Sequence, residues 1–212
     1  IQSSPHPVIE FSWTQVHSEI TPGKRAYHAA SYVGSDQGVV IYGGWNGLTY
    51  LSDAWRFITE NSTWVSLTMV GNNLAGASDV AMTSLGQRQF FLLGGEIKGF
   101  HWLNYAFVLE VNLTQNTITA TPVVGQSNPT ARADSAVASF GDGNILLFGG
   151  QFLNENIFSD TWMMQVGCFP GKFSISFNVT ACKACPQGKF ESNTNKGTLC
   201  NICPGNSTTS IV

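Results

Sequence analysis

Three pairs of adjacent glycines recur at a regular interval along this chain of 212 residues. The pairs begin at Gly43, Gly94 and Gly149, so the two intervals are 51 and 55 residues. Each pair closes a short apolar run, and an acidic or amide residue follows it shortly before an aromatic residue. A period of about 50 residues predicts a repeated unit that can bury its apolar faces only against neighbouring units.

Short apolar or alternating segments divide the three units into strands, and long helical patterns are absent from the sequence. The alternation at 11–16 predicts one extra strand ahead of the first unit. We therefore expect an all-β fold with almost no helix. The other expected strands are 26–33, 39–42, 53–58 and 63–67, then 80–85, 89–93, 105–111 and 117–121, then 135–140, 144–148 and 160–166.

The first unit resembles a kelch repeat. The residues that carry the resemblance are Arg25-x-x-His28, the diglycine, Asp53-Ala-Trp55 and Trp64. The kelch family folds as a β-propeller of four-stranded blades, so the resemblance implies that each unit is a blade.

The other two units depart from this pattern in part. Ala77 stands at the arginine position of the second unit, whereas the third keeps Arg132 but has Ser135 at the histidine position. The resemblance covers about residues 10–167 and implies kelch-type β-propeller blades, three plus one extra strand. We take 1–167 as the propeller segment.

Three blades are fewer than the four to eight with which propellers close. In one arrangement the 11–16 strand completes the third blade and a second chain supplies further blades. In the other, the missing blades precede Ile1 in a longer polypeptide, which we favour because Ile1 is no natural start. Either arrangement leaves apolar sheet faces or edges on this segment that favour association, including a homo-oligomer or filament.

The last segment, 168–212, is polar and rich in cysteine. Its spacing fits a zinc ribbon or a set of disulfides, and the odd fifth cysteine, the repeated Cys-Pro turns and the glycosylation sequons favour disulfides. The segment resembles the small modules of ephrin-receptor and tumour-necrosis-receptor ectodomains. That resemblance implies the pairs Cys168–Cys182 and Cys185–Cys200, with the partner of Cys203 lying beyond Val212.

Four Asn-x-Ser/Thr sequons occur in the chain, and two of them fall in expected turns between third and fourth strands. A glycan on such a turn would disturb no packing. With the cysteines, they predict an extracellular glycoprotein that carries N-linked glycans. The sequon asparagines are Asn61, Asn112, Asn178 and Asn206.

Several function classes find no support in the sequence. The net charge is −3 and no run of Lys or Arg exists, so we expect no nucleic-acid partner, and no apolar stretch is long enough for a membrane span. Some kelch propellers are copper oxidases, but His17, His28 and His101 form no ligand spacing here. We expect no metal, cofactor or enzymatic activity.

The charged residues that recur with the repeat are expected to serve the fold. We expect Arg25, His28 and Arg132 to bond the backbones of neighbouring blades, and Asp53 and Asp160 to accept hydrogen bonds at strand starts.

The loops that follow the diglycines should emerge together on one face of the propeller. Loops on a rigid scaffold commonly carry recognition, and aromatic residues are favoured anchors. The alternative is that these aromatics fold back onto the blades. The candidate binding residues are Trp45, Tyr50, Phe100, His101, Trp102 and Phe152.

Together these patterns predict a non-catalytic extracellular glycoprotein segment that acts as a structural or protein-interaction scaffold. Its partners would be other chains or further domains of a larger surface protein or extracellular filament. The alternative is a cell-surface receptor or glycan-binding ectodomain that uses the loop face.

Overall fold

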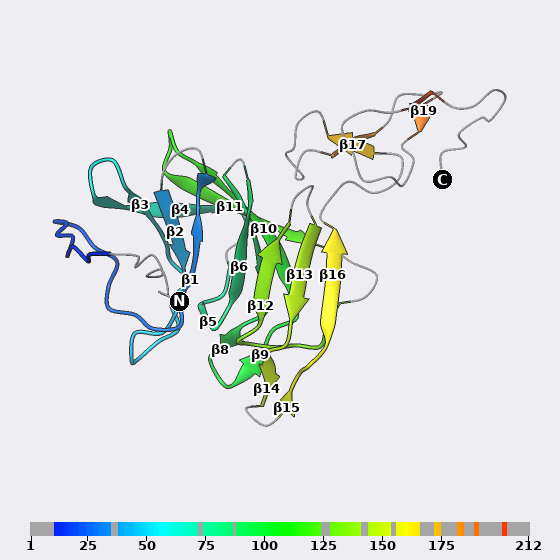
Figure 1. Ribbon diagram of the computed structural model, residues 1–212, viewed down its shortest axis with the longest axis horizontal. Helices are drawn as coiled ribbons and strands as arrows, with labels where there is room; N and C mark the ends of the chain where they lie inside the picture. The colour runs from blue at the N-terminus through cyan, green and yellow to red at the C-terminus, as the bar shows by residue number, and fades with distance from the viewer. Residues whose placement is uncertain are drawn as a thin grey trace, which may run out of the picture.

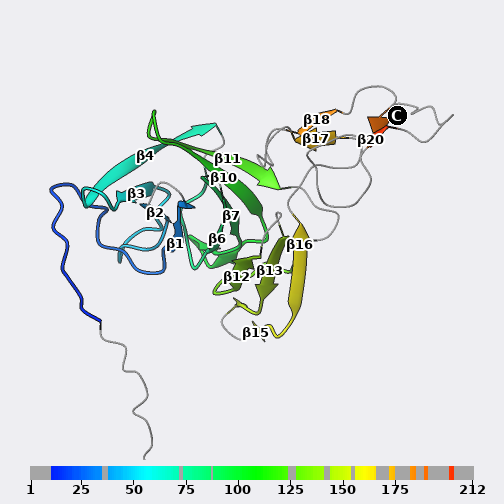
Figure 2. The ribbon, with the colours of Figure 1, turned by 45° about the horizontal axis from the view of Figure 1, so that its top comes forward.

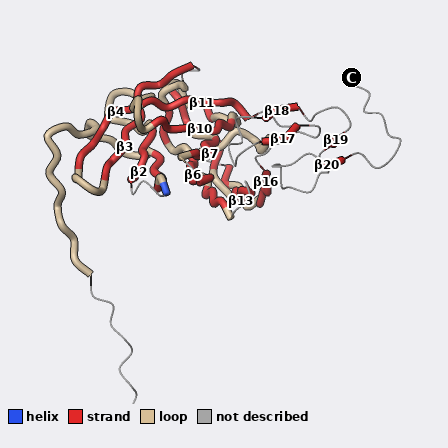
Figure 3. Tube along the Cα trace, turned by 90° about the horizontal axis from the view of Figure 1, so that it is seen from above, coloured by secondary structure: helices blue, strands red, loops and turns tan. Residues whose placement is uncertain are grey.

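The computed structural model describes residues 11–34, 38–71, 74–86, 88–123, 128–140, 144–153 and 156–165, together with four short strand fragments in the cysteine-rich segment. Nearly all of the described chain is strand or loop (Figure 3). The expected all-β class is therefore confirmed.

The first blade is a four-stranded antiparallel sheet. Each strand pairs with the next along the chain, and the register sets Tyr42 opposite Ala29 on one side and Ala54 on the other. The strands are β1 (Ala29–Tyr32), β2 (Gly38–Tyr42), β3 (Ala54–Ile58) and β4 (Thr63–Gly71).

The second and third units repeat this arrangement, and their first strands lie in succession beside β1 (Figures 1 and 2). The second blade has four strands, namely β6 (Ala81–Gly86), β7 (Gln89–Leu93), β10 (Ala106–Asn112) and β11 (Thr117–Val123). The third has three described strands, namely β12 (Ala136–Ser139), β13 (Asn144–Phe148) and β16 (Thr161–Gln165).

The strands expected within the three units are all present, with ends that differ from the structure by at most four residues. The extra strand expected at 11–16 is wrong, because that segment pairs with no strand and leaves Phe11 and Trp13 79% and 91% exposed. An alternating segment becomes a strand only where a sheet edge is beside it to complete its hydrogen bonds. No such edge lies beside this segment in the described chain.

The hydrophobic core lies between successive blades. Side chains alternate along β7, so Phe90 and Leu92 face the first blade whereas Phe91 and Leu93 face the third. All four are buried, and burying such a side chain contributes about 1.5–3 kcal/mol. The middle blade is thus covered on both faces, and the two cores fix the blades against one another.

The outer strands of the first two blades also pair, which the repeat does not predict. β4 and β11 run parallel, with Thr68 opposite Thr117, and join both blades in one eight-stranded sheet (Figure 2). The third blade is a separate sheet with β16 at its edge.

In the cysteine-rich segment the structure describes two short ladders, and the side chains of all five cysteines lie outside the described residues. The disulfide pairing and the module at 168–212 therefore stay predictions, as does the division at residue 167. No described helix has the length and apolar character of a membrane span. The ladders pair β17 (Lys172–Ser174) with β18 (Cys182–Ala184) and β19 (Lys189–Phe190) with β20 (Asn201–Ile202).

Candidate functional site

The loops after the diglycines form short hairpins that sequence periodicity did not reveal. In the first blade the hairpin is closed by a bridge between Trp45 and Tyr50. In the other two it is built from strand pairs, and β8, β9, β14 and β15 lie together at one end of the blades (Figure 1). Those pairs are β8 (Glu96–Ile97) with β9 (His101–Trp102), and β14 (Gln151–Phe152) with β15 (Asn156–Ile157).

An arginine–aspartate pair holds the base of the first hairpin. The two terminal nitrogens of Arg25 donate to the carboxylate oxygens of Asp53 at 2.8 and 2.9 Å, and Nη1 also donates to the carbonyl of Gly43 at 3.0 Å. Trp55 Nε1 donates to the same carboxylate at 2.6 Å. These hydrogen bonds, chiefly those from Arg25, lower the pKa of Asp53.

The third blade repeats this arrangement with a more deeply buried arginine. Arg132 donates to both carboxylate oxygens of Asp160 at 2.6 and 2.8 Å and to the carbonyl of Gly149 at 2.8 Å. Trp162 Nε1 again donates to the aspartate, and the guanidinium lies 4.2 Å from the ring centroid of Phe158. Hydrogen bonds from Arg132 are the main cause that lowers the pKa of Asp160 to about 2.

The arginine side chains bond within their own blade, so the expectation that they reach a neighbouring blade is wrong. The contact between blades is made instead by the backbone at the arginine position. The second glycine of the first two pairs donates to it, from Gly44 to the Ala77 carbonyl at 2.8 Å and from Gly95 to the Arg132 carbonyl at 2.9 Å. Because only a carbonyl is needed, the second blade keeps this contact with alanine.

The first glycine of the first two pairs is required by the same contact. A Cβ on Gly94 would lie 2.4 Å from the Arg132 carbonyl oxygen, and the φ of +69° disfavours any side chain. The diglycine thus lets the next blade approach the hairpin base closely.

Three equivalent residues with positive φ line the centre of this end of the blades. Tyr27, Asp79 and Asp134 have φ of 58°, 56° and 55°. The two aspartates are each linked to the previous blade, since Asp79 donates its N–H to the Tyr27 carbonyl at 2.9 Å and Asp134 donates to the Asp79 carbonyl at 3.1 Å. With His28, Val80 and Ser135 they border an open depression of about 350 Å³.

The carboxylates at this centre affect one another. Burial is the largest cause that raises the pKa of Asp79 to about 6, and the neighbouring Asp134 and Glu96 raise it further, whereas a hydrogen bond from Ser78 opposes them. Asp134 accepts a hydrogen bond from Gln151 at 2.6 Å. Among the described residues no three His, Cys, Asp or Glu side chains gather as a metal site would need.

Four of the predicted binding residues connect or close the hairpins. Tyr50 Oη donates to Glu96 Oε1 at 2.6 Å, which links the first hairpin to the second and is the main cause that raises the pKa of Tyr50 to about 12. The rings of Trp102 and Phe152 meet edge to face at 5.5 Å and link the second hairpin to the third. Trp45 closes the first hairpin and is 40% exposed. These contacts of the four aromatics are therefore with other residues of the hairpins.

The other two predicted residues, Phe100 and His101, lie exposed at the turn of the second hairpin. Sequence reasoning missed three exposed aliphatic residues on the other two hairpins, and an Asn-Gly turn before Leu48 was a signal for one of them. We call the four exposed apolar residues the hairpin tips. Their exposed fractions are 89% for Leu48, 69% for Phe100, 51% for Leu153 and 83% for Ile157.

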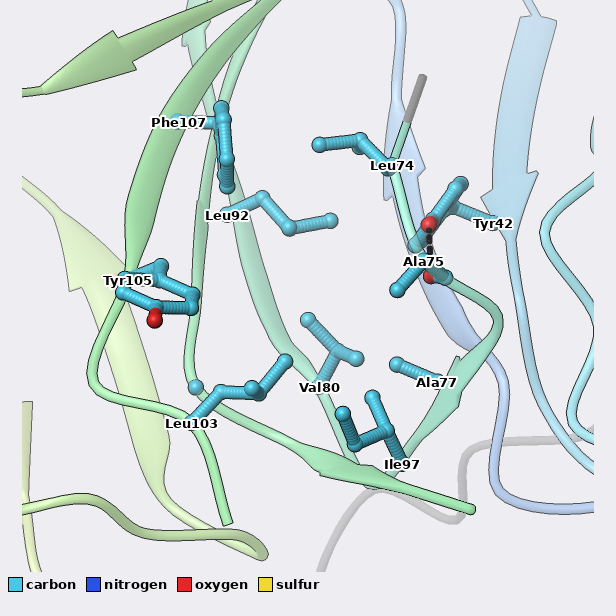
Figure 4. Close-up of a pocket in the computed structure, with 11 residues that line it drawn as sticks. Tyr42, Leu74, Ala75, Ala77, Val80, Leu92, Ile97, Leu103, Tyr105 and Phe107 are labelled. Carbon is cyan, nitrogen blue, oxygen red and sulfur yellow. Dashed lines mark hydrogen bonds between the residues drawn. The ribbon is translucent and has the colours of Figure 1, made fainter. Parts of the chain in front are cut away.

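A separate apolar cavity of about 240 Å³ lies between the first and second blades (Figure 4). Leu92, Val80 and Leu103 point into it, and at its wall Tyr42 Oη donates to the Ala75 carbonyl at 2.8 Å. None of its lining residues is charged. It belongs to the core between the blades, and its lining residues are apolar apart from the hydroxyls of Tyr42 and Tyr105.

Comparison with known families agrees with the repeat. Residues 8–170 match a family model described as the KLHDC2/KLHL20/DRC7 Kelch-repeats domain, which spans more than half of the chain. The match stops short of most of the expected cysteine-rich module. A comparison with curated proteins found no match.

Proposed function

This chain belongs to the kelch-repeat family, and we propose that it is a non-catalytic scaffold that binds another protein through the hairpin tips. Kelch-repeat domains are generally protein-interaction domains. The observation that carries the proposal is the exposure of one or more large apolar side chains on each of the three hairpins. Exposed apolar side chains gathered on one face of a domain mark interaction sites.

The hairpins are braced before any partner arrives. The Tyr50–Glu96 hydrogen bond and the Trp102–Phe152 contact connect them in sequence, and the Arg–Asp pairs hold the bases of the first and third. A face ordered in advance loses less conformational entropy on binding. This supports recognition by the tips, with the half-buried aromatics in a supporting role.

Site-specific photo-cross-linking tests this function. A photoreactive amino acid at position 48 or 100 should form a cross-link to a partner protein, whereas the same amino acid at Val70, 45% exposed on outer strand β4, should not. Equal capture from all three positions would show non-specific contact and contradict the proposal.

We further propose that the protein is extracellular and carries N-linked glycans. Asn61 and Asn112 support this because both are exposed beside the turns that follow third strands, Asn61 within the β3–β4 turn and Asn112 as the last residue of β10. In the first sequon Thr63 Oγ1 donates to Asn61 Oδ1 at 2.6 Å, and in the second the Thr114 N–H donates to Asn112 Oδ1 at 3.1 Å. The sequon hydroxyl or backbone is thus already beside the acceptor amide.

Secretion from a eukaryotic host tests this. Glycosidase treatment should lower the mass of the wild type, and Asn61→Gln and Asn112→Gln should each remove one glycan. A secreted protein with no glycan at either position would contradict the proposal. The sequons at Asn178 and Asn206 and the disulfides at Cys168–Cys182 and Cys185–Cys200 would be mapped in the same peptides.

Within this function, a structural subunit of a filament and a receptor or glycan-binding ectodomain remain distinct. A filament subunit would bury the hairpin tips against further copies, whereas a receptor would leave them free for its ligand. The apolar character of Leu48 and Ile157 favours a protein partner over a sugar, because glycan sites need polar groups as well as aromatic ones.

A further inference from the structure

One face of the third blade exposes the positions that the first two blades bury. The last residues of the second strands, Tyr42, Leu93 and Phe148, are equivalent by register, and their exposed fractions are 1%, 5% and 52%. The side of a blade on which these three residues lie points toward the next blade, and we call it the trailing face. On the third blade it comprises Ala136, Ala138, Leu146, Phe148 and Met163.

The third strands show the same contrast. Arg56, Val108 and Met163 occupy equivalent positions and are 8%, 3% and 74% exposed. In the first two blades the cover is the blade that follows, because the apolar residues on each trailing face, such as Tyr42 and Val108, belong to the core shared with it. The trailing face of the third blade therefore exposes the same positions that a following blade covers in the first two.

The backbone hydrogen bonds between successive blades show which donors and acceptors a further blade must provide. From the first blade to the second, the Gly44 N–H donates to the Ala77 carbonyl, the Ala77 N–H donates to the Leu51 carbonyl at 3.1 Å, and the Asp79 N–H donates to the Tyr27 carbonyl.

The same three contacts recur from the second blade to the third. Gly95 donates to the Arg132 carbonyl, Arg132 donates to the Leu103 carbonyl at 3.0 Å, and Asp134 donates to the Asp79 carbonyl. The interface is thus a repeated pattern that holds despite different side chains.

The third blade presents the same set again. Phe158 takes the place of Leu51 and Leu103, since its N–H donates to the Gly150 carbonyl at 2.9 Å just as theirs donate to Gly44 and Gly95. A Cβ on Gly149 would find its nearest described neighbour at 3.3 Å, compared with 2.4 Å at Gly43 and Gly94 where the next blade fills the space.

The first blade carries the complementary half. Arg25 stands at the position of Ala77 and Arg132, and Tyr27 at the position of Asp79 and Asp134. On the side that would face a preceding blade, Tyr32 is 53% exposed whereas Ile41 is 5% exposed, and Tyr27 at the centre is 62% exposed.

We propose that the trailing face of the third blade binds the first blade of a second copy of this chain. The Gly150 N–H of one copy would donate to the Arg25 carbonyl of the other, the Arg25 N–H to the Phe158 carbonyl, and the Tyr27 N–H to the Asp134 carbonyl. Two copies joined twice in this way form a ring with two-fold symmetry. The ring has six blades, within the range in which propellers close.

This inference rests on the blade repeat and uses neither Leu48 nor Phe100 of the hairpin tips. Ile157, in contrast, would lie beside the first hairpin of the other copy, because it stands at the position of Tyr50 and Trp102. Light scattering on the full chain under reducing conditions should give twice the chain mass of 22.9 kDa. Met163→Asp places a charge in the proposed interface but at a position already 74% exposed, so the variant should keep the wild-type melting temperature and dissociate at least tenfold more readily. Leu48→Asp, on an 89% exposed hairpin tip, is the matched control and should remain dimeric.

A photoreactive amino acid at position 163 supplies the positive test, because its cross-link should map to the first blade of the other copy. A wild-type monomer at 100 µM, a dimer unaffected by Met163→Asp, or a cross-link to any other region would each overturn the proposal. The last two results would mean that copies associate through another surface, such as the cysteine-rich segment or the hairpin tips.

Discussion

Arg132 and Asp160 form a bidentate ion pair, with nitrogen–oxygen distances of 2.6 and 2.8 Å, at the base of the third hairpin. The arginine side chain is fully buried and the aspartate side chain is 38% exposed. Arg132 lies ahead of the first strand of the blade, and it bonds both Asp160 at the start of the third strand and the Gly149 carbonyl at the end of the second, so it fixes the loop from which the hairpin projects.

Removing this arginine should destabilise the protein. Arg132→Ala leaves the Asp160 carboxylate and the Gly149 carbonyl without their main donor, and we expect a loss of about 2–3 kcal/mol in the free energy of unfolding, less than for a fully buried pair because Asp160 is partly exposed. Urea denaturation measures it. Lys98→Ala, at an exposed position of the second hairpin, should change stability by less than about 0.5 kcal/mol. Equal effects would contradict the structural role of the pair.

The free energy of unfolding should change with pH in two ranges, one set by the titration of Asp160 and the other by that of Asp79. The lowered pKa of Asp160, about 2, contributes stability that is present above the ordinary aspartate pKa near 4 and is lost as pH falls toward 2. The raised pKa of Asp79, about 6, acts in the opposite direction, so its contribution is present below about pH 4 and is lost as pH rises through 6.

The melting temperature measured from pH 8 to pH 2 should therefore rise between pH 7 and 5 and fall below pH 4. Asp79→Asn should abolish the rise and keep the fall. If the melting temperature of this variant still rises between pH 7 and 5, another titrating group causes the rise.

Much of the fold was predictable because its determinants are local. Alternation and glycine turns placed every strand of the three blades, since a side chain on a half-buried sheet faces either the core or solvent. The extra strand at 11–16 failed on the same logic, because alternation describes a side-chain pattern and does not supply a pairing edge. The β4–β11 pairing depends on how whole blades meet, so no local pattern encodes it.

The site was predicted only in part. The sequence located the loops after the diglycines but did not predict that they form hairpins, because strands of two residues such as Glu96–Ile97 are too short to show a period. It also chose the largest aromatics as binding residues, whereas the structure uses Trp102 and Phe152 against each other. Asp79 and Asp134 could have been found, because both lie two residues after the arginine position of their blade.

The close approach of successive blades predicts a strong difference between two glycine variants. Gly94→Ala creates a clash with the Arg132 carbonyl in addition to backbone strain at φ +69°, whereas Gly71→Ala, at φ +84°, has no atom within 4 Å of the new Cβ. We expect a loss of about 1 kcal/mol for Gly71→Ala from strain alone, and at least about 2 kcal/mol more for Gly94→Ala. Thermal or urea unfolding compares them, and equal losses would argue against the proposed packing.

Loss of the Tyr50–Glu96 hydrogen bond should loosen the first hairpin without unfolding the blades. Tyr50→Phe removes one hydroxyl and should cost about 1 kcal/mol. Hydrogen exchange should then speed up for amides of residues 46–50 and stay unchanged in the β7 strand. Unchanged exchange in the hairpin would mean that the hydrogen bond does not brace it.

The central claim is that this kelch-repeat segment recognises a protein through its hairpin tips, and the affinity for the cross-linked partner tests it most directly. Purified partner should bind the double variant Leu48→Asp/Phe100→Asp at least tenfold more weakly than the wild type, because apolar anchors dominate binding energy. Val70→Asp, on the outer strand, should bind as the wild type does. Equal affinity for all three proteins would contradict the account and place recognition on another face.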